Sequence, residues 1–209
     1  MIDLAARLAA RGVILQTRPI AEGDEDAFAD LSEPLARRRA SGAARIAARA
    51  ALSALGGDGA APLPRSAGGY PLWPAGFVGS LAHDEALAVA LAAPAARFVA
   101  LGVDVEPCEP LPADVTQIAL LPAERRAAAA DPPLGRAIFA AKEAVYKAVN
   151  PFDGTALEYE DIDVDLANCR ARLRDGRSLE LDWVGWAGGR RWIVAALAAA
   201  ETLDAETLE

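Results

Sequence analysis

The chain has 209 residues, of which 53% are hydrophobic, and it carries a formal net charge of −9. This length suffices for one compact domain or two small lobes, and the acidic balance argues against a nucleic-acid partner, which requires a basic face. Two cysteines do not make a disulfide framework, and neither a secretory leader nor an apolar stretch of membrane-spanning length stands out. We therefore expect a protein of the reducing cytoplasm with no membrane partner.

The first part of the chain predicts a short helix over residues 1 to 11 and a short strand over residues 13 to 16. An acidic loop over residues 21 to 30 comes next. A long helix rich in Ala and Arg then runs over residues 34 to 55, where two glycines end it. Residues 56 to 79 are rich in Gly and Pro, which predicts irregular structure.

Two apolar runs follow, over residues 86 to 91 and 98 to 105. We expect them to pair as antiparallel strands across a turn at Pro94. The last predicted elements are a helix over residues 136 to 149 and two strands over residues 178 to 184 and 192 to 197, joined across Gly188 and Gly189.

The order of these elements predicts the fold class. Helix and strands come first, then a Gly- and Pro-rich stretch, then helix and strands again. This order favours an α+β fold of two similar lobes that meet near residue 98. We expect an N-terminal lobe over residues 1 to 97 and a C-terminal lobe over residues 98 to 209, with the active site between them.

Two segments carry most of the chemistry. Apolar and acidic residues alternate around Asp104 and Glu106, which indicates a strand with both carboxylates on one face. Phe139, Glu143 and Lys147 are spaced four residues apart, so they share one face of a helix. If strand and helix pack together, three carboxylates converge with a lysine. Such hard oxygen ligands suit Mg²⁺, and the lysine then suits a phosphate.

Each of these features also has a plainer interpretation. Asp104 and Glu106 could form a solvated strand face, and Glu143 with Lys147 could be a surface pair of small energetic value. The metal site therefore depends on the two segments lying together. His83 is the only histidine, and a lone histidine is often structural. Its place before an apolar run nevertheless favours contact with a ligand.

Arginines cluster on the long helix of this acidic protein, with five of them within thirteen positions. A local basic patch suits a small phosphorylated ligand better than a polymer. A solvated helix face is the plainer alternative, because Arg is a good helix former. We keep that alternative for Arg38 and Arg39 and favour a binding role for Arg37 and Arg45.

Four segments occur in a fixed order between residues 37 and 147. They are the Arg-rich helix over residues 37 to 55, the run 71 to 76 followed by Gly79, Ser80 and His83, the acidic strand 102 to 106, and the helix 139 to 147. In this order they resemble the 4′-phosphopantetheinyl transferases, specifically the two-lobed siderophore-synthase type, the group of enterobactin synthase component D.

The resemblance implies a reaction. A serine of an apo acyl, peptidyl or aryl carrier protein attacks the β-phosphate of coenzyme A, 4′-phosphopantetheine moves to the serine, and adenosine 3′,5′-bisphosphate leaves. It also implies that Asp104, Glu106 and Glu143 hold Mg²⁺, that Glu143 or a water it holds takes the serine proton, and that Lys147 contacts the transferred phosphate. We expect a monomer that activates siderophore, non-ribosomal peptide or polyketide synthases.

The same resemblance assigns the nucleotide end of coenzyme A. Arg37, Arg45, Ala82 and His83 match positions that bind it in the family, and Lys142 is a further candidate for the same anionic pocket. The chain departs from the family pattern at Ala82, where Ser or Thr is usual. Two further departures are Ala44 in place of Gly and Ser41 in place of an aromatic residue.

These departures bear on coenzyme A affinity more than on the chemistry, because none touches the acidic motif. They leave open a second class of function, a non-catalytic module that binds coenzyme A or a carrier protein. A generic Mg²⁺-dependent nucleotide hydrolase is a third interpretation. The chain, however, lacks the Gly-rich phosphate-cradling loop of the Walker type.

Overall fold

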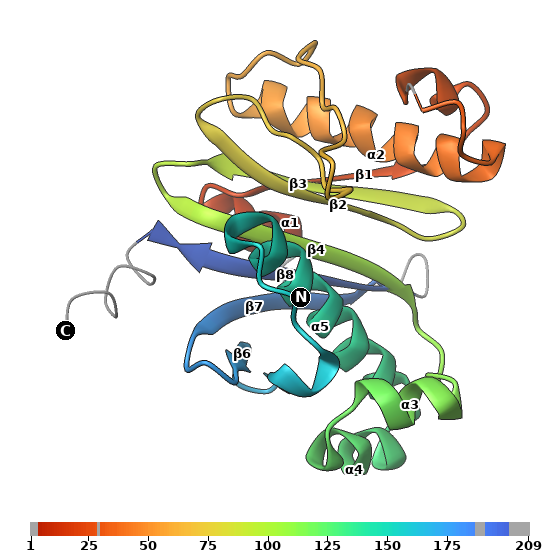
Figure 1. Cartoon of the computed structure of the whole chain (residues 1–209), viewed down its shortest axis with the longest axis vertical. Helices are drawn as coiled ribbons and strands as arrows, with labels where there is room; N and C mark the ends of the chain where they lie inside the picture. Colours follow the sequence, from red (N-terminus) through yellow and green to blue (C-terminus); the bar gives the residue numbers. More distant parts are fainter. Residues whose placement is uncertain (1–3, 29, 187–190, 201–209) are drawn as a thin grey trace.

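The computed structural model describes residues 4–28, 30–186 and 191–200, and Figure 1 shows its elements in four layers. Helix α2 (Leu35–Ala54) covers a three-stranded antiparallel sheet, and helix α5 (Pro132–Asp153) covers a five-stranded one. The inner faces of the two sheets pack together. This arrangement confirms the predicted α+β class. The other elements are α1 (Leu4–Ala10), β1 (Ile14–Pro19), η1 (Asp24–Ala27), β2 (Phe77–His83), β3 (Leu87–Pro94), β4 (Phe98–Pro107), α3 (Ala113–Ala119), α4 (Pro122–Ala130), η2 (Tyr159–Asp161), β5 (Ile162–Asp165), β6 (Arg170–Leu173), β7 (Ser178–Trp186) and β8 (Arg191–Ala199).

The first sheet has the strand order β1-β3-β2, with the apolar β3 in its centre. Side chains alternate along β3, so that Val89 and Leu91 enter the core between the sheets while Ala88 and Ala90 face α2. The buried face of α2 is also built mainly of alanines. Small side chains on both surfaces let helix and sheet approach closely. The predicted Ala- and Arg-rich helix is thereby confirmed.

The second sheet has the order β4-β8-β7-β6-β5, so the acidic strand β4 lies at its edge. Val103 and Val105 are buried in the core between the sheets. Because side chains alternate along a strand, Asp104 and Glu106 share the opposite face, beneath α5. The predicted alternation is therefore confirmed.

Helix α5 lies directly on β4, and Gly102 makes this approach possible. A Cβ atom at Gly102 would lie only 1.7 Å from the carbonyl oxygen of Ala144 in α5. The absence of a side chain at this position brings the helix with Glu143 and Lys147 onto the acidic strand. The contact between the two predicted segments is thus present in the fold.

One predicted strand pairing is wrong. The apolar runs on either side of the Pro94 turn do not pair with each other, because β3 lies between β1 and β2 while β4 pairs with β8. Both runs are buried on both faces, so their apolar pattern does not select a partner strand. Strand β2 lies beside β4 instead, and the backbone N–H of Val103 donates to Ser80 Oγ over 3.1 Å. His83, at the end of β2, is thereby brought to the acidic strand's side of the molecule.

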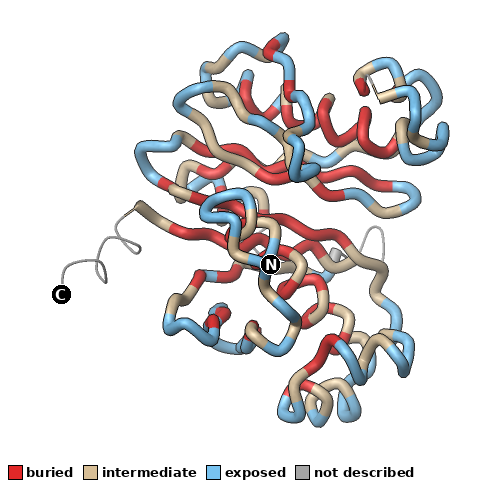
Figure 2. The backbone as a smooth tube through the Cα atoms, viewed as in Figure 1, coloured by how far each residue is buried: buried red, intermediate tan, exposed pale blue. Residues whose placement is uncertain are grey.

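The N-terminal helix α1 ties the first half of the chain to the second sheet. Leu4 and Leu8 are buried in the core between the sheets, and Arg7 forms an ion pair with Asp182 of β7 at 2.6 Å. The predicted helix and strand at the start of the chain are confirmed as α1 and β1. Figure 2 shows the buried backbone concentrated in the sheets and in the two covering helices.

The predicted final strand pair is confirmed as β7 and β8, whereas the turn at Gly188 and Gly189 lies outside the described residues. The Gly- and Pro-rich stretch is irregular up to β2, apart from an isolated bridge between Arg65 and Pro71. Helices α3 and α4 and strands β5 and β6 were not predicted. Within the described ranges, no helix is both long and apolar enough to cross a membrane.

Candidate active site

Asp104 is the buried centre of the acidic strand. Only 6% of the residue is exposed, and Lys147 Nζ lies 2.5 Å from its Oδ1 atom. Burial raises the pKa of Asp104 to about 6, although the Lys147 ammonium opposes the rise. The second oxygen, Oδ2, is buried without a hydrogen-bond partner among the residues that the structure describes. An unpaired buried oxygen is costly in a purely structural position, so Asp104 is a functional candidate.

Glu106 is held by Arg136 from the first turns of α5. Arg136 Nη1 donates to Glu106 Oε2 over 3.0 Å, and Nη2 donates to the carbonyl of Pro110 over 3.1 Å. Burial raises the pKa of Glu106, while the charge and hydrogen bond of Arg136 oppose the rise. The sequence interpretation gave Arg136 no role. Its spacing of two helical turns from Glu143 is the signal that would have placed it on the same face.

Glu143 meets a tyrosine that the sequence interpretation also missed. The Tyr159 hydroxyl donates to Glu143 Oε1 over 2.7 Å, and the Tyr159 ring packs against Phe139 with centroids 5.7 Å apart. Tyr159 begins the short 3₁₀ helix η2, which follows α5. Phe139 and Glu143 therefore contact one partner from a shared helix face, as their spacing predicted.

The three acidic side chains fit a divalent cation in their chemistry, and the unpaired Oδ2 of Asp104 is a suitable ligand oxygen. They also interact electrostatically, because Glu106 and Glu143 both contribute to the raised pKa of Asp104. As they are positioned, however, the described parts of the chain contain no group of three or more Asp, Glu, His or Cys side chains that could hold a metal ion. Each carboxylate instead turns to its own donor, a lysine, an arginine or a tyrosine. The predicted convergence of carboxylates is therefore only partial.

A groove of about 300 Å³ opens beside Lys147, between residues 68–81 and helix α5. Lys147 therefore pairs with a buried carboxylate and also borders a space of the size that ligands use. A larger hollow of about 690 Å³ lies between α4 and β5, and none of the predicted site residues lines it. The groove is lined by Tyr70, Pro71, Trp73, Ser80, Lys147 and Asn150, among others.

His83 is the last residue of β2, and it is exposed. The protein around its ring nevertheless lowers its pKa by desolvation, and the charges of Lys147 and Arg37 lower it further. Asp84 opposes this lowering, and the three residues His83, Lys147 and Arg37 lie close enough to interact electrostatically. Arg37 is itself exposed and pairs with Glu33 at 3.5 Å. Ala82 is buried in the core between the sheets, so its methyl group does not reach the surface of the site.

Arg45 borders a second hollow, of about 430 Å³. Its guanidinium lies 4.4 Å from the ring centroid of Phe28, and its Nε donates to the carbonyl of Leu63 over 2.9 Å. Arg65, which the sequence interpretation missed in its Pro-rich surroundings, lies 5.4 Å from the same centroid. Burial, together with the charges of Arg65 and Arg49, lowers the pKa of Arg45 to about 10. Three arginines around one hollow suit a ligand with a phosphate group.

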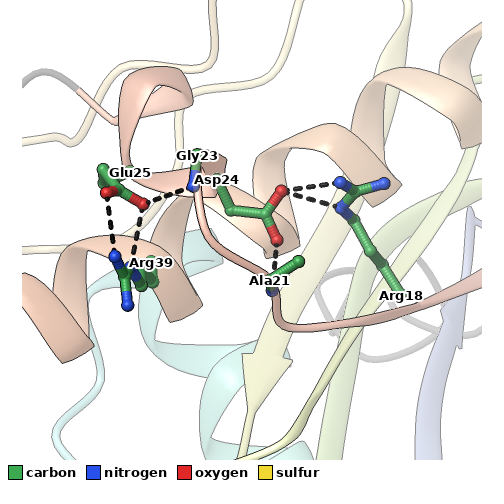
Figure 3. A network of polar contacts seen from close by, with 6 residues as sticks. All are labelled: Arg18, Ala21, Gly23, Asp24, Glu25 and Arg39. Carbon is green, nitrogen blue, oxygen red and sulfur yellow. Dashed lines mark hydrogen bonds and ion pairs between the residues drawn. The ribbon is translucent and has the colours of Figure 1, made fainter.

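The segment that carries Phe28 is fixed in place by a polar network (Figure 3). Asp24 of η1 is buried and accepts hydrogen bonds from Arg18 Nη2 over 2.6 Å and from the backbone N–H of Ala21 over 2.9 Å. Glu25 accepts from Arg39 Nε of α2 over 3.0 Å. The network attaches η1 to α2. Phe28 is the residue that directly follows η1 in the chain, so the network also fixes its position. It also gives Arg39 a structural partner.

Lys142 does not occupy the place that the sequence predicted. It is fully buried, its Nζ lies 2.7 Å from Glu124 Oε2, and it donates to the carbonyl of Tyr159 over 2.9 Å. Burial lowers its pKa, although Glu124 opposes the change. The predicted ligand contact is corrected, because a fully buried ammonium with two internal partners cannot face a bound ligand.

Comparison with known proteins places the chain in a family. A model of the 4′-phosphopantetheinyl transferase N-terminal domain matches residues 24–93, and a model of the 4′-phosphopantetheinyl transferase superfamily matches residues 100–197. The chain is 37% identical to the 4′-phosphopantetheinyl transferase Svp of Streptomyces mobaraensis, over 75% of this chain and 70% of that protein. It is 33% identical to PptT of Mycobacterium tuberculosis, over 78% of this chain and 67% of that protein.

The chain therefore belongs to the 4′-phosphopantetheinyl transferase family. Its enzymatic activity, its co-substrate coenzyme A and its carrier-protein partner follow from this membership, and the predictions of these three are confirmed. A third relative, Npt of Nocardia iowensis, is 39% identical over 60% of this chain and 57% of that protein. The narrower siderophore-synthase type stays a prediction.

Proposed function

We propose that the chain is a Mg²⁺-dependent transferase that loads carrier proteins of secondary-metabolite synthases, such as those for siderophores, non-ribosomal peptides or polyketides. The observation that carries the proposal is the ion pair of Asp104 and Lys147 at the border of the groove. A buried carboxylate whose pKa is raised to about 6, joined to a lysine that lines a groove, is typical of a catalytic site.

Asp104, Glu106 and Glu143 would hold Mg²⁺, and the bound ion would neutralise the diphosphate of coenzyme A. The unpaired Oδ2 of Asp104 supports this assignment. So does the arrangement of the two glutamates, since Arg136 bonds one oxygen of Glu106 and Tyr159 bonds one oxygen of Glu143. In each glutamate this bond occupies one oxygen, and the other oxygen would bind the ion.

The side chains around the carboxylates have distinct roles in the proposed reaction. Lys147 places positive charge beside the phosphoryl group that is transferred, where negative charge develops. Glu143, or a water that it holds, accepts the proton of the attacking serine. His83 and Arg37 extend the positive region along the diphosphate, which the electrostatic interactions of His83 with Arg37 and with Lys147 support.

The hollow around Arg45 is the proposed site for the 3′-phosphate of coenzyme A. Arg49 and Arg65 repel Arg45 there, because their charges lower its pKa, while Arg65 also pairs with Glu33 at 3.0 Å. A bound phosphate relieves this repulsion, and guanidinium groups bind its oxygens in pairs. Phe28, which both Arg45 and Arg65 contact, holds the two guanidinium groups in place.

We further propose a monomer in the cytoplasm. Both walls of the groove come from one chain, which supports the first point. Cys108 and Cys169 are free, which suits a reducing compartment. The preference for secondary-metabolite carriers rests on the two-lobed organisation and the resemblance in residues 37–147.

The metal and the site are tested together by measuring transfer rate against Mg²⁺ concentration. We expect the wild-type rate to saturate with Mg²⁺ and to fall to background in EDTA, while Asp104→Ala loses at least about 100-fold in rate with its circular dichroism unchanged. Asp163→Ala removes an exposed carboxylate from another strand, β5, and should match the wild type. Undiminished transfer in EDTA would reject the metal, and full activity of Asp104→Ala would remove this residue from the site.

A further inference from the structure

We propose that Tyr159 is a positioning residue for Glu143, an inference that rests on the proposed function. The Tyr159 hydroxyl donates to Glu143 Oε1 over 2.7 Å. This bond fixes one carboxylate oxygen and leaves Oε2 for a metal ion or for the serine proton. Tyr159 acts through Glu143 and contacts neither the substrate nor the reacting atoms.

The donor itself is held at two points. Its ring packs on Phe139, one helical turn before Glu143 on α5, with centroids 5.7 Å apart. Its backbone carbonyl accepts a hydrogen bond from Lys142 Nζ over 2.9 Å. Because ring and backbone are both anchored, the hydroxyl is presented to Glu143 in one orientation. A donor that is fixed in this way can orient a carboxylate, whereas a mobile one cannot.

The anchor extends into the core through Glu124, which is 4% exposed and lies 2.7 Å from Lys142 Nζ. Glu124 Oε1 accepts from the backbone N–H of Val164 over 3.0 Å, and Oε2 accepts from that of Leu121 over 2.6 Å. One buried carboxylate therefore joins α4, α5 and β5. The buried Lys142 therefore has a structural role, because its bonds to Glu124 and to the Tyr159 carbonyl fix the segment that bears Tyr159.

The chemistry of the donor suits the role. Asp104 and Glu106 are bonded by cations, whereas Glu143 is bonded by a neutral hydroxyl, so its negative charge is not cancelled. A tyrosine hydroxyl ordinarily carries its proton at neutral pH. The phenol therefore remains a donor at neutral pH. A neutral, fixed donor orients a carboxylate and preserves the charge that a base or metal ligand needs.

The test uses Tyr159→Phe, which keeps the ring and removes only the hydroxyl. The affinity for Mn²⁺, a paramagnetic probe for Mg²⁺, is measured by electron paramagnetic resonance in the presence of coenzyme A, alongside transfer kinetics and melting temperature. We expect the Mn²⁺ dissociation constant to rise about 10-fold and kcat to fall by a similar factor, with KM for coenzyme A unchanged. Thr17→Val removes an exposed hydroxyl from strand β1 of the other sheet and should leave the Mn²⁺ affinity unchanged.

The outcomes separate this inference from the proposed function. If Tyr159→Phe only lowers the melting temperature while Mn²⁺ affinity and kcat stay at wild-type values, the hydroxyl is structural and the inference is overturned. An equal loss of Mn²⁺ affinity in Thr17→Val, or no Mn²⁺ binding by the wild type, also overturns it. If the wild type binds Mn²⁺ and Tyr159→Phe weakens that binding, the inference stands even where transfer is absent, and only the proposed function fails.

Discussion

Lys147 Nζ and Asp104 Oδ1 are joined at 2.5 Å, although 43 positions separate the two residues in the chain. The lysine comes from α5 and the aspartate from β4. Their contact depends on Gly102, where a Cβ atom would lie 1.7 Å from the carbonyl oxygen of Ala144. The charge pair at the centre of the site is therefore set by how closely a helix approaches a strand.

Gly102→Ala should disturb this approach and reduce transfer at least about 10-fold. The added methyl group overlaps backbone atoms of α5, which cannot yield as a flexible side chain would. Overpacking of this kind costs about 1–3 kcal/mol. Urea unfolding and transfer kinetics measure both effects. Wild-type activity and stability in this variant would show that the helix can move without consequence for the ion pair.

Asp104→Asn should change how stability depends on pH. Because burial raises the pKa of Asp104 from 3.8 to about 6, the folded protein binds its proton more tightly than the unfolded chain does. The wild type therefore loses stability as the pH rises through this interval, by about 2–3 kcal/mol from the size of the shift. The variant lacks this loss. The difference in free energy of unfolding, variant minus wild type, should therefore increase as the pH rises from about 4 to about 7. A difference between the two proteins that is independent of pH would contradict the raised pKa.

Lys142→Met should destabilise the protein by about 3 kcal/mol, because it leaves the buried Glu124 carboxylate without its cation. KM for coenzyme A should stay unchanged, since the ammonium faces the interior. Combining Lys142→Met with Glu124→Gln should recover part of the stability, as the uncompensated charge is then gone. A raised KM for coenzyme A with unchanged stability in Lys142→Met would contradict this account and show that Lys142 contacts the ligand.

Arg65→Gln should raise KM for coenzyme A about 10-fold or more, the effect of losing one charged hydrogen bond. KM for 3′-dephospho-coenzyme A should not change, because that compound lacks the phosphate assigned to the hollow. Arg125→Gln is the matched control, since Arg125 is a partly exposed arginine of α4 that bonds Gln117. Equal losses with both forms of the co-substrate would place the 3′-phosphate elsewhere.

The sequence predicted what is encoded locally. Periodicity around Asp104 and Glu143 predicted the acidic strand and the helix face, and the order of the elements predicted the α+β class. It did not give partners that depend on tertiary packing. Arg136 and Tyr159 bond the glutamates of the motif, and only Arg136 has a local signal, its spacing of two helical turns from Glu143. Lys142 was misassigned because it stands beside Glu143 in the chain, whereas successive helical residues point about 100° apart.

Strand partners were similarly hidden from the sequence. The run before Pro94 is apolar throughout and the run after it is apolar up to Val103, and strands buried on both faces do not show which partner they pair with. The basic hollow was only half predicted, because Arg45 belongs to a periodic helix whereas Arg65 lies in an irregular, Pro-rich stretch. Its place beside Arg45 follows from the contact that both arginines make with Phe28.

Intact-mass spectrometry of apo carrier proteins tests the proposed enzyme most directly. A panel of acyl, peptidyl and aryl carriers is incubated with this protein, coenzyme A and Mg²⁺, and each carrier is then weighed. We predict the mass of one 4′-phosphopantetheine group on secondary-metabolite carriers, lost when the acceptor serine is replaced by alanine or when Asp104→Ala replaces the wild type. Unmodified carriers across the whole panel, with coenzyme A bound by the protein, would contradict the proposal and favour a non-catalytic binding module.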